Sequence, residues 1–192
     1  YVAGAPGPRP LGVLVVPSDK PRLGGSRAGV SKFMVRERLK PLLARFKRQG
    51  RTVVFANGCF DLLHVGHLRY LNGAKRAGGP RGVLVVALNT DAGVRRLKGP
   101  SRPLMPLRER LELISALSCV DYVTSFAEPS AGALLRSLRP DIQAKGSDYT
   151  PDSVPEAALM RSLGGRVVIT GDPKNHSTTA LMGKLRRAYG RT

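Results

Sequence analysis

The sequence contains no tryptophan, only two cysteines and no long hydrophobic run. Because Cys59 and Cys119 are too few for a disulfide framework, we expect two free thiols in a reducing compartment. No stretch approaches the roughly 20 apolar residues that a membrane helix requires, and none resembles a secretory signal. We therefore expect a soluble, cytoplasmic protein without a membrane partner.

Acidic residues are also scarce, since 32 Lys and Arg stand against 13 Asp and Glu, for a formal net charge of +19. Such an excess is typical of proteins that bind nucleic acids, membrane surfaces or small polyanions. Aromatic residues make up only 5% of the chain, which leaves few rings to stack on bases. Small phosphate-bearing substrates are the favoured partners, and nucleic-acid binding by the basic N-terminal segment is the alternative.

The composition divides the chain into three segments. Residues 1–30 are rich in Gly, Pro and Arg, so we expect a flexible, basic tail there. Residues 31–50 predict an N-terminal helix, with Ser31 as the N-cap and an apolar stripe at helical spacing over residues 32–48. A chain of 192 residues suits one domain, which we assign to residues 51–192.

From residue 52 onward, predicted strands and helices alternate. Continuous apolar runs such as residues 83–87 are typical of parallel strands that are covered on both faces. We predict an α/β fold with a single, doubly wound, mostly parallel five-stranded sheet, and ligands beyond the carboxyl ends of its strands. The predicted strands are 52–56, 82–88, 121–125, 141–144 and 166–170, and the predicted helices are 65–77, 91–97, 107–117, 130–138, 155–163 and 178–189.

The most informative stretch is residues 53–70, VVFANGCFDLLHVGHLRY. A β-branched run, a Gly-bearing turn and a helix start predict a phosphate site, because a helix N-terminus presents unpaired N–H groups. His64 and His67 would share one face of the first turn, and Gly66 would let a ligand approach the backbone. The alternatives are a metal pair with Cys59 nearby, or two surface histidines. The whole run, placed after a strand, favours phosphate binding.

This run, Gly-x-Phe-Asp-x-x-His-x-Gly-His, resembles the signature of the cytidylyltransferase-like nucleotidyltransferase superfamily. Within that superfamily the chain is most similar to the adenylyltransferases of bacterial ADP-heptose synthesis. The similarity covers about residues 52–187 and implies a Rossmann-like nucleotidyltransferase fold. Further matching motifs are Leu88-Asn89-Thr90-Asp91, Arg96-Leu97-Lys98-Gly99-x-Ser101-Arg102-Pro103, Pro106-Leu107-x-x-Arg110, Val120-Asp121-Tyr122-Val123, Lys145-Gly146-x-Asp148-Tyr149 and Ser177-Thr178-Thr179.

The resemblance also implies roles for individual residues. It implies that the catalytic residues are His64, His67 and Lys98. It implies nucleotide binding by Phe60, Gly66, Arg110, Lys145, Ser177, Thr178 and Thr179, and substrate binding by Asp61, Asn89, Asp91, Arg102 and Asp148; it implies no protein ligand set for a metal.

Several of these residues have simpler structural interpretations. Phe60 could pack the turn, and Asp61, Asp91 or the Ser-Thr-Thr run could cap helices. Arg110 could form a surface ion pair with Glu109 or Glu112, which would contribute little stability.

By resemblance, the reaction is transfer of AMP from ATP to a sugar 1-phosphate, with Mg²⁺ accompanying the triphosphate and pyrophosphate released. A separate sugar kinase would supply the acceptor, and homologues of this fold commonly dimerise, which makes a homodimer one expectation. One alternative is a cytidylyltransferase that uses CTP with glycerol 3-phosphate or another alcohol phosphate. Another is a non-catalytic nucleotide-binding or nucleic-acid-binding protein. Departures from the heptose group at Ser147, residues 172–176 and helix 155–163 leave the acceptor open.

Overall fold

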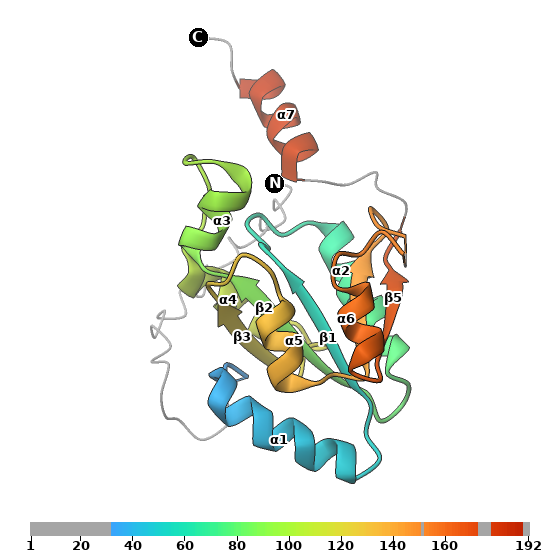
Figure 1. Cartoon of the computed structure of the whole chain (residues 1–192). Helices are drawn as coiled ribbons and strands as arrows, with labels where there is room; N and C mark the ends of the chain where they lie inside the picture. The colour runs from blue at the N-terminus through green and yellow to red at the C-terminus, as the bar shows by residue number, and fades with distance from the viewer. Residues whose placement is uncertain (1–31, 151, 173–177, 190–192) are drawn as a thin grey trace, which may run out of the picture. The chain divides into compact units, whose positions relative to one another are not determined.

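The computed structural model describes residues 32–150, 152–172 and 178–189, and within these its central element is a five-stranded sheet. The strand order is β3-β2-β1-β4-β5 and every neighbouring pair is parallel, which confirms the predicted fold class (Figure 1). The strands are β1 (Val53–Gly58), β2 (Val83–Asn89), β3 (Tyr122–Phe126), β4 (Ile142–Gly146) and β5 (Arg166–Thr170).

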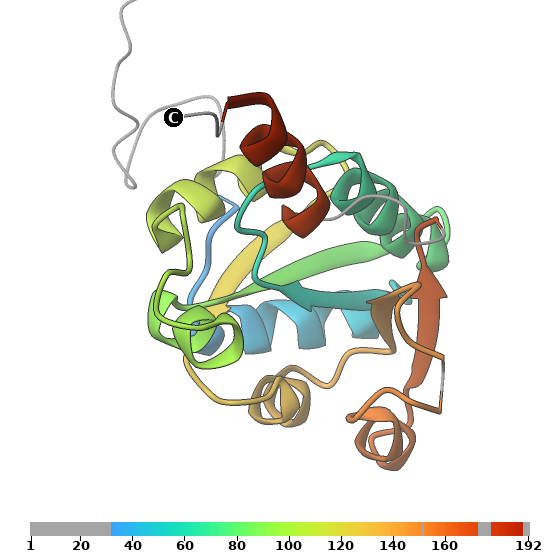
Figure 2. The same ribbon diagram turned by 90° about the horizontal axis from the view of Figure 1, so that it is seen from above.

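Helices cover both faces of the sheet. Figure 2 shows α1, α5 and α6 on one side of the strands, and α2 and α4 on the other. The helices are α1 (Arg36–Arg48), α2 (Val65–Ala77), α3 (Asp91–Lys98), α4 (Leu107–Ala116), α5 (Gly132–Leu138), α6 (Ala157–Ser162) and α7 (Thr178–Tyr189). Within the described residues, no helix is both long and apolar enough to cross a membrane.

Two hydrophobic cores follow from the alternation of side chains along the strands. Val53 and Phe55 of β1 point into the core beneath α1, α5 and α6, whereas Val54 and Ala56 point into the core beneath α2 and α4. All seven residues of β2 are buried, because this strand has neighbours on both edges and helices on both faces. Continuous apolar runs in the sequence therefore correspond to strands of a doubly covered sheet.

The N-terminal helix begins later than predicted. It starts at Arg36, with Val35 as its N-cap, rather than at Lys32. The preceding residues are extended because Phe33 forms a bridge with Val123 of β3, and the Met34 amide donates to the Val123 carbonyl at 2.8 Å. The predicted cap Ser31 and the predicted tail 1–30 lie outside the described residues, so that part of the domain division stays a prediction.

The topology determines where a ligand can bind. The chain leaves β1 towards β2 and β3 on one side, and later returns to β4 and β5 on the other. The crossovers therefore diverge at the β1–β4 boundary, and a crevice opens beyond the carboxyl ends of these strands.

Candidate active site

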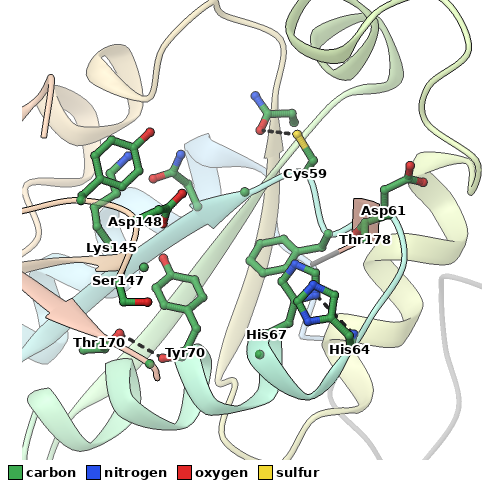
Figure 3. Close-up of a pocket in the computed structure, with 18 of the residues that line it drawn as sticks. Cys59, Asp61, His64, His67, Tyr70, Lys145, Ser147, Asp148, Thr170 and Thr178 are labelled. Atoms are coloured by element: carbon green, nitrogen blue, oxygen red, sulfur yellow. Dashed lines mark hydrogen bonds between the residues drawn. The ribbon is translucent and has the colours of Figure 1, made fainter. Parts of the chain in front are cut away.

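A cleft of about 690 Å³ lies at the carboxyl ends of β1, β2, β4 and β5. This volume is in the range typical of small-molecule sites. Figure 3 shows His64 and His67 at the start of α2 on one side, and Lys145, Ser147 and Asp148 on the other. Predicted site residues in the lining are Phe60, Asp61, His64, Gly66, His67, Asn89, Lys98, Lys145, Asp148 and Thr178.

The side of the cleft that carries His64 and His67 begins with a tight turn after β1. Phe60 adopts a positive φ of 48°, and its ring packs against His67 at 5.3 Å and stacks on Tyr70 at 6.5 Å between centroids. Gly58 permits this turn, because a Cβ at that position would lie 3.1 Å from the Phe60 ring. Phe60 is buried, so its described contacts are those of packing.

His64 and His67 are stacked, with ring centroids 3.9 Å apart. Burial, then the neighbouring His64, then Lys98 lower the pKa of His67 from 6.5 to about 4. His67 is therefore neutral near pH 7. The His64 amide donates to Nδ1 of His67 at 3.4 Å, so in the neutral ring the proton lies on Nε2. A neutral ring of this tautomer can donate one hydrogen bond to a phosphoryl oxygen.

Lys98 ends α3 and brings a positive charge to the same side of the cleft. Its electrostatic influence reaches both His67 and the Cys59 thiol. In the part of the chain that the structure describes, no carboxylate lies within ion-pair distance of its ammonium group. The Lys98 charge is thus available to a phosphate group in the cleft.

The opposite wall contains a buried ion pair. Lys145 Nζ lies 3.2 Å from Glu156 Oε2, and each side chain is only 10% exposed. Gln143 donates to the same carboxylate oxygen at 3.3 Å, and the Lys145 ammonium lies 5.4 Å from the centre of the Tyr149 ring. Lys145 lines the cleft, but Glu156 does not.

The departure at Ser147 has a structural counterpart, since its hydroxyl donates to the Asp172 carbonyl and joins the β4 and β5 loops. The Asp148 carboxylate lies close to the backbone of Gly146. A Cβ added to Gly146 would be 2.7 Å from Oδ1 of Asp148. The Ser147 bond therefore ties the β4 end of the cleft to the residues after β5.

Sequence reasoning missed Tyr70 and Asn57, which also line the cleft. The Tyr70 hydroxyl donates to the Ala144 carbonyl at 2.9 Å, and burial raises the pKa of this phenol. Tyr70 could have been found from its spacing, because it lies three residues after His67 on the same face of α2. The Asn57 side-chain oxygen is buried without a hydrogen-bond partner among the described residues, a feature that no sequence pattern reveals.

The structure corrects the surface interpretation of Arg110, which is 0% exposed and does not line the cleft. It pairs with Asp91 at 2.6 Å and not with Glu109 or Glu112 at the surface, so in this structure its guanidinium bonds within the protein. Asp91 is likewise not the cap of α3, because the Thr90 side chain accepts from the Gly93 amide.

Asp61 and Arg102 form an ion pair with each other. Arg102 does not line the cleft, and it donates to Asp61 at 2.8 Å. Figure 3 shows the Asp61 carboxylate pointing away from the other labelled side chains. Asp61 itself lines the cleft, and the substrate-binding roles expected for both residues stay predictions.

The Ser-Thr-Thr run is only partly described. Thr178 begins α7, lines the cleft, and donates from its hydroxyl to the Leu62 carbonyl at 3.5 Å. Ser177 and the side chain of Thr179 lie outside the described part of the structure.

The acidic groups of the cleft do not form a metal cage. Within residues 32–150, 152–172 and 178–189, no group of three His, Cys, Asp or Glu side chains could hold a metal ion. Among the described residues, Cys59 therefore does not form such a group with His64 and His67.

The parallel sheet and its switch-point cleft define a doubly wound α/β domain with a ligand crevice at the carboxyl ends of its strands. A family model described as cytidylyltransferase-like matches residues 55–183, and the chain belongs to that family.

Named relatives show the same relationship over most of the chain. The chain is 48% identical over 158 residues to the D-beta-D-heptose 1-phosphate adenylyltransferase of Bordetella bronchiseptica, covering 82% of this chain and 95% of that protein. It is 49% identical over 159 residues to the bifunctional protein HldE of Syntrophotalea carbinolica, covering 83% of this chain. The match spans only 32% of that relative's length.

A solved structure also resembles this fold. The lipopolysaccharide core biosynthesis protein of Thermoplasma volcanium is 31% identical, with a TM-score of 0.55. The match covers 65% of this chain and all of that one.

Proposed function

We propose that the protein transfers the adenylyl group of ATP to a heptose 1-phosphate, releasing pyrophosphate and forming an ADP-heptose. The observation that carries this proposal is the grouping of His64, His67 and Lys98 on one wall of a nucleotide-sized cleft. The acceptor follows from the relative that is named a heptose 1-phosphate adenylyltransferase and is covered almost entirely by the match.

In this reaction an oxygen of the sugar phosphate attacks the α-phosphorus of ATP, and the bond from that phosphorus to the pyrophosphate oxygen breaks. The nucleophile is already an anion, so the protein needs no strong base; orientation and charge neutralisation supply the catalysis. Neutral His67 donates a hydrogen bond from its Nε2–H to a phosphoryl oxygen without carrying a charge of its own. Lys98 and the N-terminus of α2 provide the positive potential.

The opposite wall would receive the nucleoside and the sugar. Lys145, Asp148 and Tyr149 offer a cation, a carboxylate and an aromatic ring there. The Thr178 hydroxyl, at the start of α7, would approach the leaving pyrophosphate. Mg²⁺ would arrive with the triphosphate and neutralise part of its charge. A cytoplasmic location belongs to the same proposal because ATP is the substrate, and a separate kinase for the acceptor and a homodimer remain predictions.

The test is pyrophosphate release in the presence of Mg²⁺, with ATP and CTP each crossed against heptose 1-phosphate and glycerol 3-phosphate. Turnover with ATP and heptose 1-phosphate alone is expected, and His67→Ala should reduce it by 10²-fold or more, on the order of one lost transition-state hydrogen bond. Arg108→Met, a change at an exposed residue that does not line the cleft, serves as the control. Turnover with CTP and glycerol 3-phosphate would instead assign the cytidylyltransferase reaction.

A further inference from the structure

Asp61 lies in the turn between β1 and α2 that leads to His64 and His67, which we call the histidine turn. Its side chain bonds to the segment that follows α3. Its Oδ1 accepts from the backbone amides of Leu104 at 2.7 Å and Met105 at 3.0 Å, and its Oδ2 accepts from Arg102 at 2.8 Å. The residue is 3% exposed. Burial alone would raise the pKa of Asp61, but the hydrogen bonds from Met105, Arg102 and Leu104 outweigh it, and its pKa is lower than usual. All three partners belong to one loop.

Arg110 joins the same loop to two strand ends from the other side. Its guanidinium donates to the carbonyls of Cys59 at 2.6 Å, Asn89 at 3.0 Å and Met105 at 3.0 Å. It also donates to the Asp91 carboxylate at 2.6 Å. A fully buried guanidinium with four acceptors is held in one orientation, because each lost bond would leave a buried polar group unsatisfied.

Together these bonds hold the first residue of α3 and the loop that follows the helix. Asp91 begins α3 and is bonded to Arg110. In the loop after the helix, Leu104 is bonded to Asp61, and Met105 is bonded to both Asp61 and Arg110. Lys98 ends this helix and lines the cleft. The position of the Lys98 ammonium relative to His67 therefore depends on the bonds of Asp61, which lines the cleft, and of Arg110, which does not.

We propose that Asp61 and Arg110 are positioning residues that hold Lys98 against the histidine turn, and that neither side chain contacts a substrate. The kinetic part of this inference rests on the proposed function. The structural part is independent of it, since the loop contacts exist whatever the reaction is.

Two substitutions at Asp61 separate positioning from direct action. Asn can place its amide oxygen where Oδ1 lies and keep both backbone bonds, although it loses the Arg102 ion pair. Ala removes all three bonds. A carboxylate that orients a metal or sugar phosphate through its charge would be lost equally in both variants, so only a positioning role predicts that Asp61→Asn rescues what Asp61→Ala loses.

The activity-independent test is hydrogen–deuterium exchange. Pro103 and Pro106 have no amide hydrogen, so uptake by residues 103–106 reports on Leu104 and Met105 alone. Exchange there should be at least about tenfold faster in Asp61→Ala and Arg110→Met than in the wild type, and near the wild-type rate in Asp61→Asn and the Arg108→Met control. Unchanged exchange in Asp61→Ala would overturn the proposal even if the wild type shows no turnover.

The kinetic test compares kcat and KM at a temperature where circular dichroism shows every variant folded. Asp61→Ala should lower kcat by about 10²-fold, because misplacing a catalytic group by about 1 Å has an effect of this size, with KM for ATP changing less than about threefold. Asp61→Asn should stay within about fivefold of the wild type. If Asp61→Asn is as inactive as Asp61→Ala while its exchange is normal, the carboxylate acts directly and the proposal fails. Should Arg110→Met not fold, the Asp61 pair of variants decides.

Discussion

The buried pair of Lys145 and Glu156 leads to the strongest prediction about stability. Both side chains are 10% exposed, and Glu156 has only Lys145 and Gln143 as described polar partners. Lys145→Met keeps a similar volume but leaves the carboxylate buried without its cation. Breaking a buried pair in this way costs about 3–5 kcal/mol. At roughly 2–4 °C per kcal/mol for a chain of this size, the melting temperature should fall by about 6–20 °C.

The two partners should not be equivalent. Lys145 lines the cleft, so its ammonium can turn towards water when Glu156 is changed. Glu156 does not line the cleft, so its carboxylate stays away from water when Lys145 is changed. We therefore expect Glu156→Gln to destabilise the protein less than Lys145→Met. The double variant Lys145→Met with Glu156→Leu should recover most of the loss, because an apolar pair of similar volume often replaces a buried ion pair without penalty.

Urea denaturation of the wild type, Lys145→Met, Glu156→Leu and the double variant of these two substitutions measures the coupling directly as a double-mutant cycle, and Glu156→Gln is measured beside it. Unchanged m-values would show that the comparison concerns the same unfolding reaction. A loss below about 1 kcal/mol for Lys145→Met would refute the reasoning. If that small loss came with a large rise in KM for ATP, the main interaction of the Lys145 ammonium would be with the nucleotide and not with Glu156.

Three further perturbations test other parts of the structure. The pKa of His67 is about 4 when folded and near 6.5 when unfolded, so the unfolded state binds more protons between these values. The free energy of unfolding should therefore fall as the pH falls from about 6.5 towards 4, with a loss of about 2 kcal/mol at pH 5. In urea titrations, His67→Asn should lack this loss of about 2 kcal/mol. Tyr70→Phe removes the bond to the buried Ala144 carbonyl and should lower the free energy of unfolding by about 1–2 kcal/mol, measured in urea; no change would mean that water replaces the hydroxyl. Gly73→Ala gains helix propensity of about 1 kcal/mol but places a Cβ 2.9 Å from Thr170 Cβ, so a net loss of stability is expected in thermal melts, and a gain would show that β5 yields easily.

Local sequence patterns were sufficient to predict the fold and the shared face of the two histidines on one side of the cleft. The apolar run of residues 83–87 predicted a covered parallel strand, and β2 is buried throughout. The spacing of His64 and His67 after a strand predicted their common face, and their rings stack at 3.9 Å. Such features are readable because hydrophobic periodicity and helix-start signals depend on neighbours only a few residues away.

Tertiary structure alone decided what the polar residues bond to. Sequence assigned Asp61 and Arg110 to ligands, but their partners lie in loops and strand ends as far as 44 and 51 residues away, which no local spacing encodes. The same holds for the hydroxyl of Tyr70, which reaches a carbonyl 74 residues along the chain. Periodicity shows which face of an element is buried, whereas the orientation of a buried polar side chain depends on which acceptors the packed elements bring within about 3 Å.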